Sequence, residues 1–144
     1  MLPTFDTAIV HGVVIRAPRE QVFETLTRAE GWDAWFTRGM ELDLRPGGSI
    51  VFRWKEWGPE QITTEDYGEV VDVKVPERFA FTWHSGETMV EIELADSEQG
   101  TEVWLIDSGY PDTPEGHERM LDCAAGWGEA LTLLKFYVEH GLTY

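Results

Sequence analysis

Two segments far apart in the chain alternate apolar and polar residues with a period of two, each around a short glycine-containing turn. One segment covers residues 40–54 with its turn at 46–48, and the other covers residues 79–94 with its turn at 85–86. A period of two is typical of a strand with one buried face, and a slip of one residue would expose that whole face. Each segment therefore predicts a β-hairpin of defined register.

The alternation also predicts which residues pair across the strands of each hairpin. In the 79–94 hairpin the expected apolar pairs are Trp83 with Thr88, Phe81 with Val90 and Phe79 with Ile92, and the polar face pairs His84 with Glu87, Ala80 with Glu91 and Arg78 with Glu93. In the 40–54 hairpin they are Leu44 with Ile50, Leu42 with Phe52 and Met40 with Trp54, with Glu41 facing Arg53 on the reverse. The two hairpins together predict a sheet with one aromatic-rich face that another element must cover.

The last long segment of the chain is the expected cover. Thr113 is a good N-cap, Pro114 suits the first helical position, and Gly141 suits the C-cap of a helix over Glu115–His140. Apolar residues recur at spacings of three and four, which places them on one helical stripe. The stripe consists of Leu121, Ala124, Trp127, Leu131, Leu134 and Val138. A helix of that length, about 39 Å at 1.5 Å per residue, is long enough to cross a whole sheet.

The remaining elements are read from apolar runs and breakers. We expect a strand over 8–15, short helices over 18–27 and 29–36, a polar loop or lid over 56–65, and strands over 67–75 and 101–110. Strands that follow one another through short turns favour an antiparallel sheet and the α+β class. The chain of 144 residues is expected to form a single domain over 1–144.

The formal net charge is −16, which disfavours nucleic acid and anionic membranes as partners. The N-terminus lacks a signal-peptide pattern and no apolar run reaches about 18 residues, so we expect a cytoplasmic protein. A phosphate loop, a dinucleotide fingerprint and a metal-spaced His/Cys cluster are absent, so no cofactor and no metal is expected. The single cysteine, Cys123, excludes a disulfide within one chain and reads as a structural thiol rather than a nucleophile.

Short motifs along the chain resemble one protein family in their order and spacing. They are Val14-Ile15-Arg16-Ala17-Pro18 before Val22-Phe23, Trp35-Phe36, Arg45-Pro46-Gly47-Gly48, Gly68-Glu69-Val70, Pro76-Glu77-Arg78-Phe79, Phe81-Thr82-Trp83, Gly100-Thr101-Glu102-Val103, Ser108-Gly109-Tyr110 and Gly126-Trp127. From about residue 9 to 139 the chain resembles the START-like (SRPBCC) superfamily, in the branch of activator of heat-shock protein 90 ATPase homologues. The resemblance implies a helix-grip fold: a curved antiparallel sheet of about six to seven strands, two short helices after the first strand, and a long C-terminal helix packed across the sheet over a cavity.

Among the polar residues, Asp107 is the candidate for chemistry. A four-residue turn after Asp96 pairs Val90 with Asp107, which puts this carboxylate on the apolar inner face. A buried carboxylate raises its pKa unless it is paired, and such groups cluster at functional sites. The alternative is that the register is off by one, or that Asp107 caps a loop. Relatives often carry histidine at this position, so this chain departs from the family pattern at Asp107.

Other polar positions are interpreted as structural. His84 is expected to be a solvated turn residue, and Glu87, Glu91 and Glu93 are expected to be solvated charges on the outer face. The two glycines that flank Trp127, Gly126 and Gly128, fit a close approach of helix to sheet, or else room for a ligand.

The leading hypothesis is a non-enzymatic protein that binds a small hydrophobic or aromatic molecule between the sheet and the long helix. The candidate lining residues are Trp35, Phe52, Trp54, Phe81, Trp83, Val90, Asp107, Trp127 and Leu131. One alternative is a cyclase- or hydrolase-type enzyme that uses Asp107 as acid or base. The other is a stress-related, co-chaperone-like interaction module. A homodimer is an open alternative for the assembly.

Overall fold

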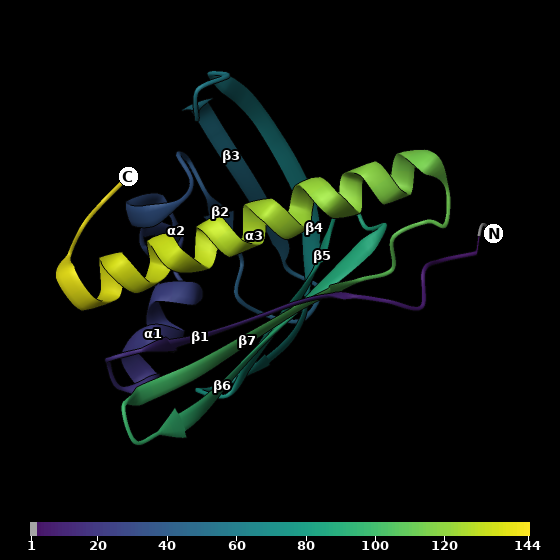
Figure 1. Ribbon diagram of the computed structural model, residues 1–144. Coiled ribbons are helices and arrows are strands. Elements are labelled where there is room, and N and C mark those ends of the chain that lie inside the picture. The colour runs from purple at the N-terminus through teal and green to yellow at the C-terminus, as the bar shows by residue number, and fades with distance from the viewer. Residues whose placement is uncertain (1–2) are drawn as a thin grey trace.

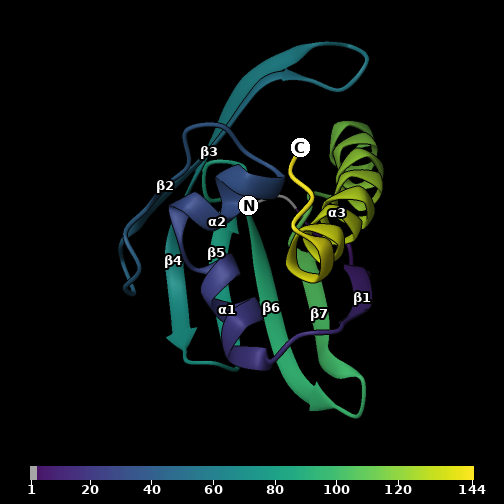
Figure 2. The same ribbon diagram turned by 90° about the vertical axis from the view of Figure 1, so that its left-hand side faces the viewer.

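The computed structural model describes residues 3–144, in which seven strands form one antiparallel sheet and three helices cover one face of it (Figure 1). The elements are β1 (Ile9–Ile15), α1 (Arg19–Leu26), α2 (Ala29–Trp35), β2 (Glu41–Leu42), β3 (Ser49–Trp57), β4 (Ile62–Lys74), β5 (Arg78–Trp83), β6 (Thr88–Ser97), β7 (Gly100–Ser108) and α3 (Pro114–His140). The strand order is β1-β7-β6-β5-β4-β3-β2. Figure 2 shows the sheet curving around α1, α2 and α3. The predicted α+β helix-grip architecture is confirmed.

The central strands have the predicted register. Phe81 pairs with Val90 in the β5–β6 hairpin, and Val90 pairs in turn with Asp107 of β7. The turn between β5 and β6 differs from the prediction, because it takes in residues 84–87 rather than two residues. His84 and Ser85 both have positive φ there, 53° and 57°. His84 therefore leaves the strand, and its side chain does not continue the polar outer face.

The predicted register of the 40–54 hairpin is wrong by two residues. Leu42 pairs with Ile50 and not with Phe52. The connecting loop is longer than predicted because residues 43–48 hydrogen-bond among themselves, with Gly48 N–H donating to the Arg45 carbonyl. Leu44 lies in this loop and is exposed. A shift of two keeps every side chain on its predicted face, so Arg53 still forms an ion pair with Glu41 at 2.5 Å.

The predicted loop or lid over 56–65 is also wrong. β3 runs to Trp57 and β4 begins at Ile62, so these residues form the tip of a hairpin that projects beyond α3 (Figure 1). The register shifts between Trp54 and Trp57, where Glu56 has a φ of 52°. This bulge, together with exposure of residues 62–65, removes the apolar alternation that identifies a strand.

The long helix α3 has the predicted caps, but only part of the predicted stripe is buried: Trp127, Leu131 and Leu134 are buried, whereas Leu121 is exposed. Thr113 accepts a hydrogen bond from Gly116 N–H, and Gly141 takes the left-handed conformation at the C-cap. Trp127 of α3 packs against Trp83 of β5 with ring centroids 5.5 Å apart, and their exposed fractions are 3% and 7%. The burial of both tryptophans is thus confirmed. Within residues 3–144, no helix combines the length and the apolar character that crossing a membrane requires.

Candidate functional site

An apolar hollow of about 350 Å³ lies between α3 and the projecting β3–β4 hairpin. Five aromatic side chains, from α3, β5, β3 and the residue after α2, form most of its wall. The lining residues are Phe36, Trp54, Trp57, Ile62, Thr64, Trp83, Asp122, Cys123, Gly126, Trp127 and Glu129. The aromatic face of the sheet is therefore covered by helix over most of its area but stays open at this edge.

The two helix glycines beside Trp127 have different environments. A Cβ atom at Gly128 would lie 3.3 Å from His11 Cε1 of β1, so this glycine allows helix and sheet to approach closely. A Cβ atom at Gly126 would meet no atom within 4 Å, apart from its own helix turn and chain neighbours. Close packing thus explains Gly128, whereas Gly126 faces the open space of the apolar hollow.

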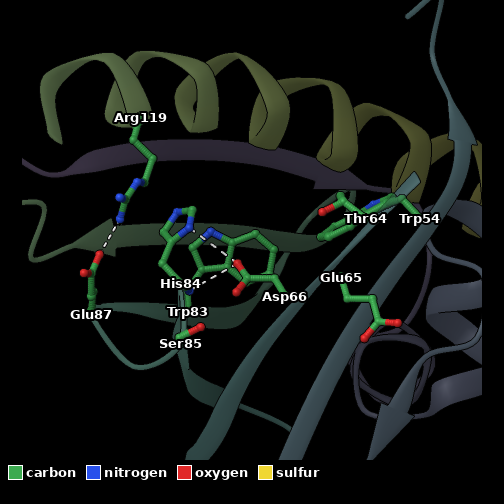
Figure 3. A pocket seen from close by; sticks show the side chains of 9 residues that line it. All are labelled: Trp54, Thr64, Glu65, Asp66, Trp83, His84, Ser85, Glu87 and Arg119. Carbon is green, nitrogen blue, oxygen red and sulfur yellow. Dashed lines mark hydrogen bonds and ion pairs between the residues drawn. The ribbon is translucent and has the colours of Figure 1, made fainter. Parts of the chain in front are cut away.

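A second hollow, of about 580 Å³, adjoins the first and is polar (Figure 3). It shares Trp54, Thr64 and Trp83 with the apolar hollow. Its other lining residues are Glu65, Asp66, His84, Ser85, Glu87 and Arg119. Figure 3 shows Arg119 of α3 bridging to Glu87, so this carboxylate reaches the helix side rather than the outer face predicted for it.

His84 is a partly buried residue of the site, and the prediction of a solvated turn histidine is wrong. Its side chain is 18% exposed, with Nδ1 3.4 Å from Asp66 Oδ2. Its Nε2 lies 3.3 Å from both Tyr110 Oη and Cys123 Sγ. Burial lowers the pKa of His84, and the Asp66 carboxylate partly offsets this effect. The imidazole is therefore neutral at pH 7.

Asp107 is fully buried on the inner face, as the register predicted. Its Oδ2 accepts hydrogen bonds from Tyr110 Oη at 2.6 Å and from Trp127 Nε1 at 3.1 Å, while Oδ1 has no partner among the described residues. Burial raises the pKa of Asp107, and the two hydrogen bonds lower it. Burial is the larger effect, and the resulting pKa is about 6. Asp107 lines neither hollow, so its acid–base role stays an untested prediction.

Of the nine predicted lining residues, three face the hollows: Trp54, Trp83 and Trp127. The other six are buried: Trp35, Phe52, Phe81, Val90, Asp107 and Leu131. The prediction missed Phe36, Trp57 and Ile62 as lining residues, whereas Gly126 is one of the two glycines for which room for a ligand was a predicted alternative. Trp57 and Ile62 were missed because residues 56–65 were predicted to be a loop. Their apolar side chains within a polar segment were the signal that could have identified them as buried or lining residues.

The sheet, the crossing helix and the aromatic hollow between them define a helix-grip protein of the START-like class, whose members serve as ligand-binding or co-chaperone-like modules. A family model described as "Activator of Hsp90 ATPase homolog 1-like protein" matches residues 16–139, and the chain belongs to this family. No curated protein matches the chain.

Solved structures share the fold over nearly the whole chain. Protein SSP2350 of Staphylococcus saprophyticus is 26% identical, with 96% of each chain covered and a TM-score of 0.78. Protein BH1534 of Bacillus halodurans is 25% identical, covering 96% of this chain and 100% of its own, with a TM-score of 0.76. The Aha1 dimer of Colwellia psychrerythraea is 22% identical, covering 94% and 98%, with a TM-score of 0.79.

Proposed function

We propose that the protein binds a small hydrophobic or aromatic molecule in the apolar hollow. The observation that carries this proposal is the aromatic wall beside Gly126, because a helix-interior glycine costs about 1 kcal/mol relative to alanine and here leaves space rather than contact. The volume of about 350 Å³ is in the range of small-molecule sites.

The walls suit a planar aromatic ligand. The rings of Trp54 and Trp83 meet edge to face with centroids 5.9 Å apart, and Trp127 packs against Trp83. Aromatic pairs of this geometry contribute about 0.5–1.5 kcal/mol beyond the burial of area. Because apolar burial is the driving force, we expect the affinity to survive high salt.

The polar hollow next to it would hold the polar end of the same molecule. Its donors and acceptors include the His84 imidazole, the Asp66 carboxylate and the Arg119 guanidinium. A ligand with an aromatic body and a polar substituent would therefore bind in one orientation.

The test fills the hollow from the helix side. Gly126→Leu places a side chain in the open space, whereas Ala125→Leu, on the exposed face of α3, is the matched control. A panel of aromatic compounds is titrated by tryptophan fluorescence. We expect Gly126→Leu to weaken binding by at least about tenfold, which corresponds to about 1.4 kcal/mol, and Ala125→Leu to leave it unchanged. Equal binding by both variants, or no binder in the panel, would refute the proposal.

The proposal also bears on a protein partner and on self-association. If no small molecule binds, the co-chaperone-like module of the family name becomes the leading function. A homodimer is proposed because one protein of this fold is described as a dimer. Sedimentation equilibrium with and without the ligand tests the assembly directly.

A further inference from the structure

We propose that Cys123, His84 and Asp66 act as nucleophile, general base and orienting carboxylate where the two hollows meet, and that they hydrolyse an ester or thioester of a hydrophobic acid. This inference rests on the proposed function, because the apolar hollow must first bind the acyl part of the substrate. The three residues come from α3, the β5–β6 turn and β4, so the fold alone brings them together.

The three side chains form a chain of contacts in the order that nucleophilic catalysis requires. Cys123 Sγ lies 3.3 Å from His84 Nε2, and His84 Nδ1 lies 3.4 Å from Asp66 Oδ2. Asp66 Oδ2 also accepts from the backbone N–H of His84 at 3.2 Å, which ties the carboxylate to the turn that carries the imidazole.

The groups around His84 favour the tautomer that a general base needs. A carboxylate beside Nδ1 favours the proton on Nδ1, which leaves Nε2 as an acceptor. Tyr110 Oη cannot supply Nε2 with a proton while it donates to Asp107 Oδ2. Cys123 is then the donor toward Nε2. Burial raises the pKa of the Cys123 thiol, which Tyr110 and Trp83 partly offset, so the resting pair is a neutral thiol and a neutral imidazole.

The two hollows divide the substrate between them. Cys123 lines the apolar hollow, where the hydrophobic acyl group would lie, and His84 and Asp66 line the polar hollow, where the leaving group would lie. Trp83 borders both, and its buried Nε1–H has no hydrogen-bond partner of ordinary geometry among residues 3–144. We assign this N–H as the donor to the negative charge that develops on the carbonyl oxygen.

The reaction balances without any further reagent than water. The Cys123 thiol proton passes to His84 Nε2 as Sγ bonds to the carbonyl carbon. The carbon–oxygen or carbon–sulfur bond to the leaving group then breaks, and that group departs as an alcohol or thiol with the proton from His84. Water next gives a proton to Nε2 and attacks the thioester, the Sγ–carbon bond breaks, and Cys123 regains a proton as the acid leaves.

The experiment uses 4-nitrophenyl phenylacetate, with nitrophenol release and intact mass spectrometry as readouts. Because the chain has one cysteine, an acyl adduct that forms on the wild-type protein and is lost in Cys123→Ala is a thioester on Cys123. The variants are Cys123→Ala, His84→Asn and Asp66→Asn, with His140→Asn at the exposed end of α3 as the control. Asparagine tolerates the positive φ of His84, so the turn should survive. Unchanged circular dichroism and melting temperature verify the fold of each variant.

We expect Cys123→Ala to abolish the adduct, and His84→Asn to slow its formation by about 100-fold, the usual size of a general-base effect. Asp66→Asn should give a smaller loss, and His140→Asn none. The polar groups that face His84 come from several elements. They are Asp66 of β4, Glu87 of the β5–β6 turn, Tyr110 after β7, and Arg119 and Cys123 of α3. Since the pKa of His84 is lowered, the wild-type rate should level off below pH 7, whereas His84→Asn should keep rising as the thiolate forms.

Two results would overturn the inference: no adduct on Cys123, or an adduct that forms equally fast in His84→Asn. The matching 4-nitroanilide, which serves as an unreactive analogue, separates this failure from that of the binding proposal. If the anilide quenches tryptophan fluorescence but no adduct forms, the hollow binds and the catalytic assignment is wrong. If neither is seen, both are wrong.

Discussion

Replacing Asp107 by asparagine should change how stability depends on pH. Burial raises the pKa of Asp107 from 3.8 to about 6. A group with a raised folded-state pKa favours folding while it is protonated, and this contribution is lost as pH rises from the unfolded pKa through the folded one. At 1.36 kcal/mol per unit, the ionised carboxylate costs the native state about 3 kcal/mol at pH 8.

At pH 5 the native carboxyl is mostly protonated, and the same linkage gives a cost of about 1.5 kcal/mol. Asparagine removes the pH-dependent part. Its amide N–H adds a fixed cost of about 1–3 kcal/mol if it takes the unpartnered Oδ1 position. The clean quantity is therefore the stability of Asp107→Asn relative to wild type at pH 8 minus that at pH 5, which should be about +1.5 kcal/mol.

Urea unfolding at pH 5 and at pH 8 measures this difference. Both pH values lie above the isoelectric point, which is near 4.4. Glu118→Gln, at an exposed position of α3, is the control, and its relative stability should not change between the two pH values. A difference near zero for Asp107→Asn, or one of opposite sign, would mean that Asp107 is not desolvated and that the argument from burial fails.

Two further pairs of variants test the sheet and the helix. Arg78→Ala should lower the free energy of unfolding by about 1–3 kcal/mol, because Arg78 meets three carboxylates within 3.1 Å, and high salt should restore part of this loss. Arg45→Ala breaks one exposed ion pair and should lower the free energy of unfolding by under about 1 kcal/mol. Gly68→Ala should prevent stable folding, since its Cβ would lie 1.9 Å from the Thr82 carbonyl oxygen, and Gly126→Ala should gain about 0.5–1 kcal/mol. Thermal and urea unfolding of the four variants would contradict this if the order within either pair were reversed.

Where alternation ran unbroken between tight turns, the sequence predicted the structure to the residue. The pairing of Val90 with Phe81 and Asp107 followed from one apolar face and two short connections. The same reasoning failed in the 40–54 hairpin, where the loop covers residues 43–48 instead of 46–48 and the register is shifted by two residues. It failed again at Glu56, because a bulge interrupts the period that the reasoning depends on.

The candidate site was predictable only in part, for a similar physical reason. Periodicity finds residues that share the face of one element, and so it found Asp107 and Trp127. His84 and Cys123 lie 39 positions apart on a turn and a helix, and no pattern links them. The positive φ of His84 also reverses the direction that strand alternation assigned to its side chain. Tertiary structure is required to bring these two residues together.

The most direct test of the binding proposal is the response of the indole N–H signals in two-dimensional 1H–15N NMR to an aromatic ligand. The seven tryptophans divide into two sets by position. Trp54, Trp57, Trp83 and Trp127 line the apolar hollow, and Trp32, Trp35 and Trp104 do not. We predict that titration with a binder shifts the signals of the first set and leaves those of the second set unchanged. Shifts centred on Trp104, on the outer face of β7, or no shifts at saturating ligand, would contradict the account.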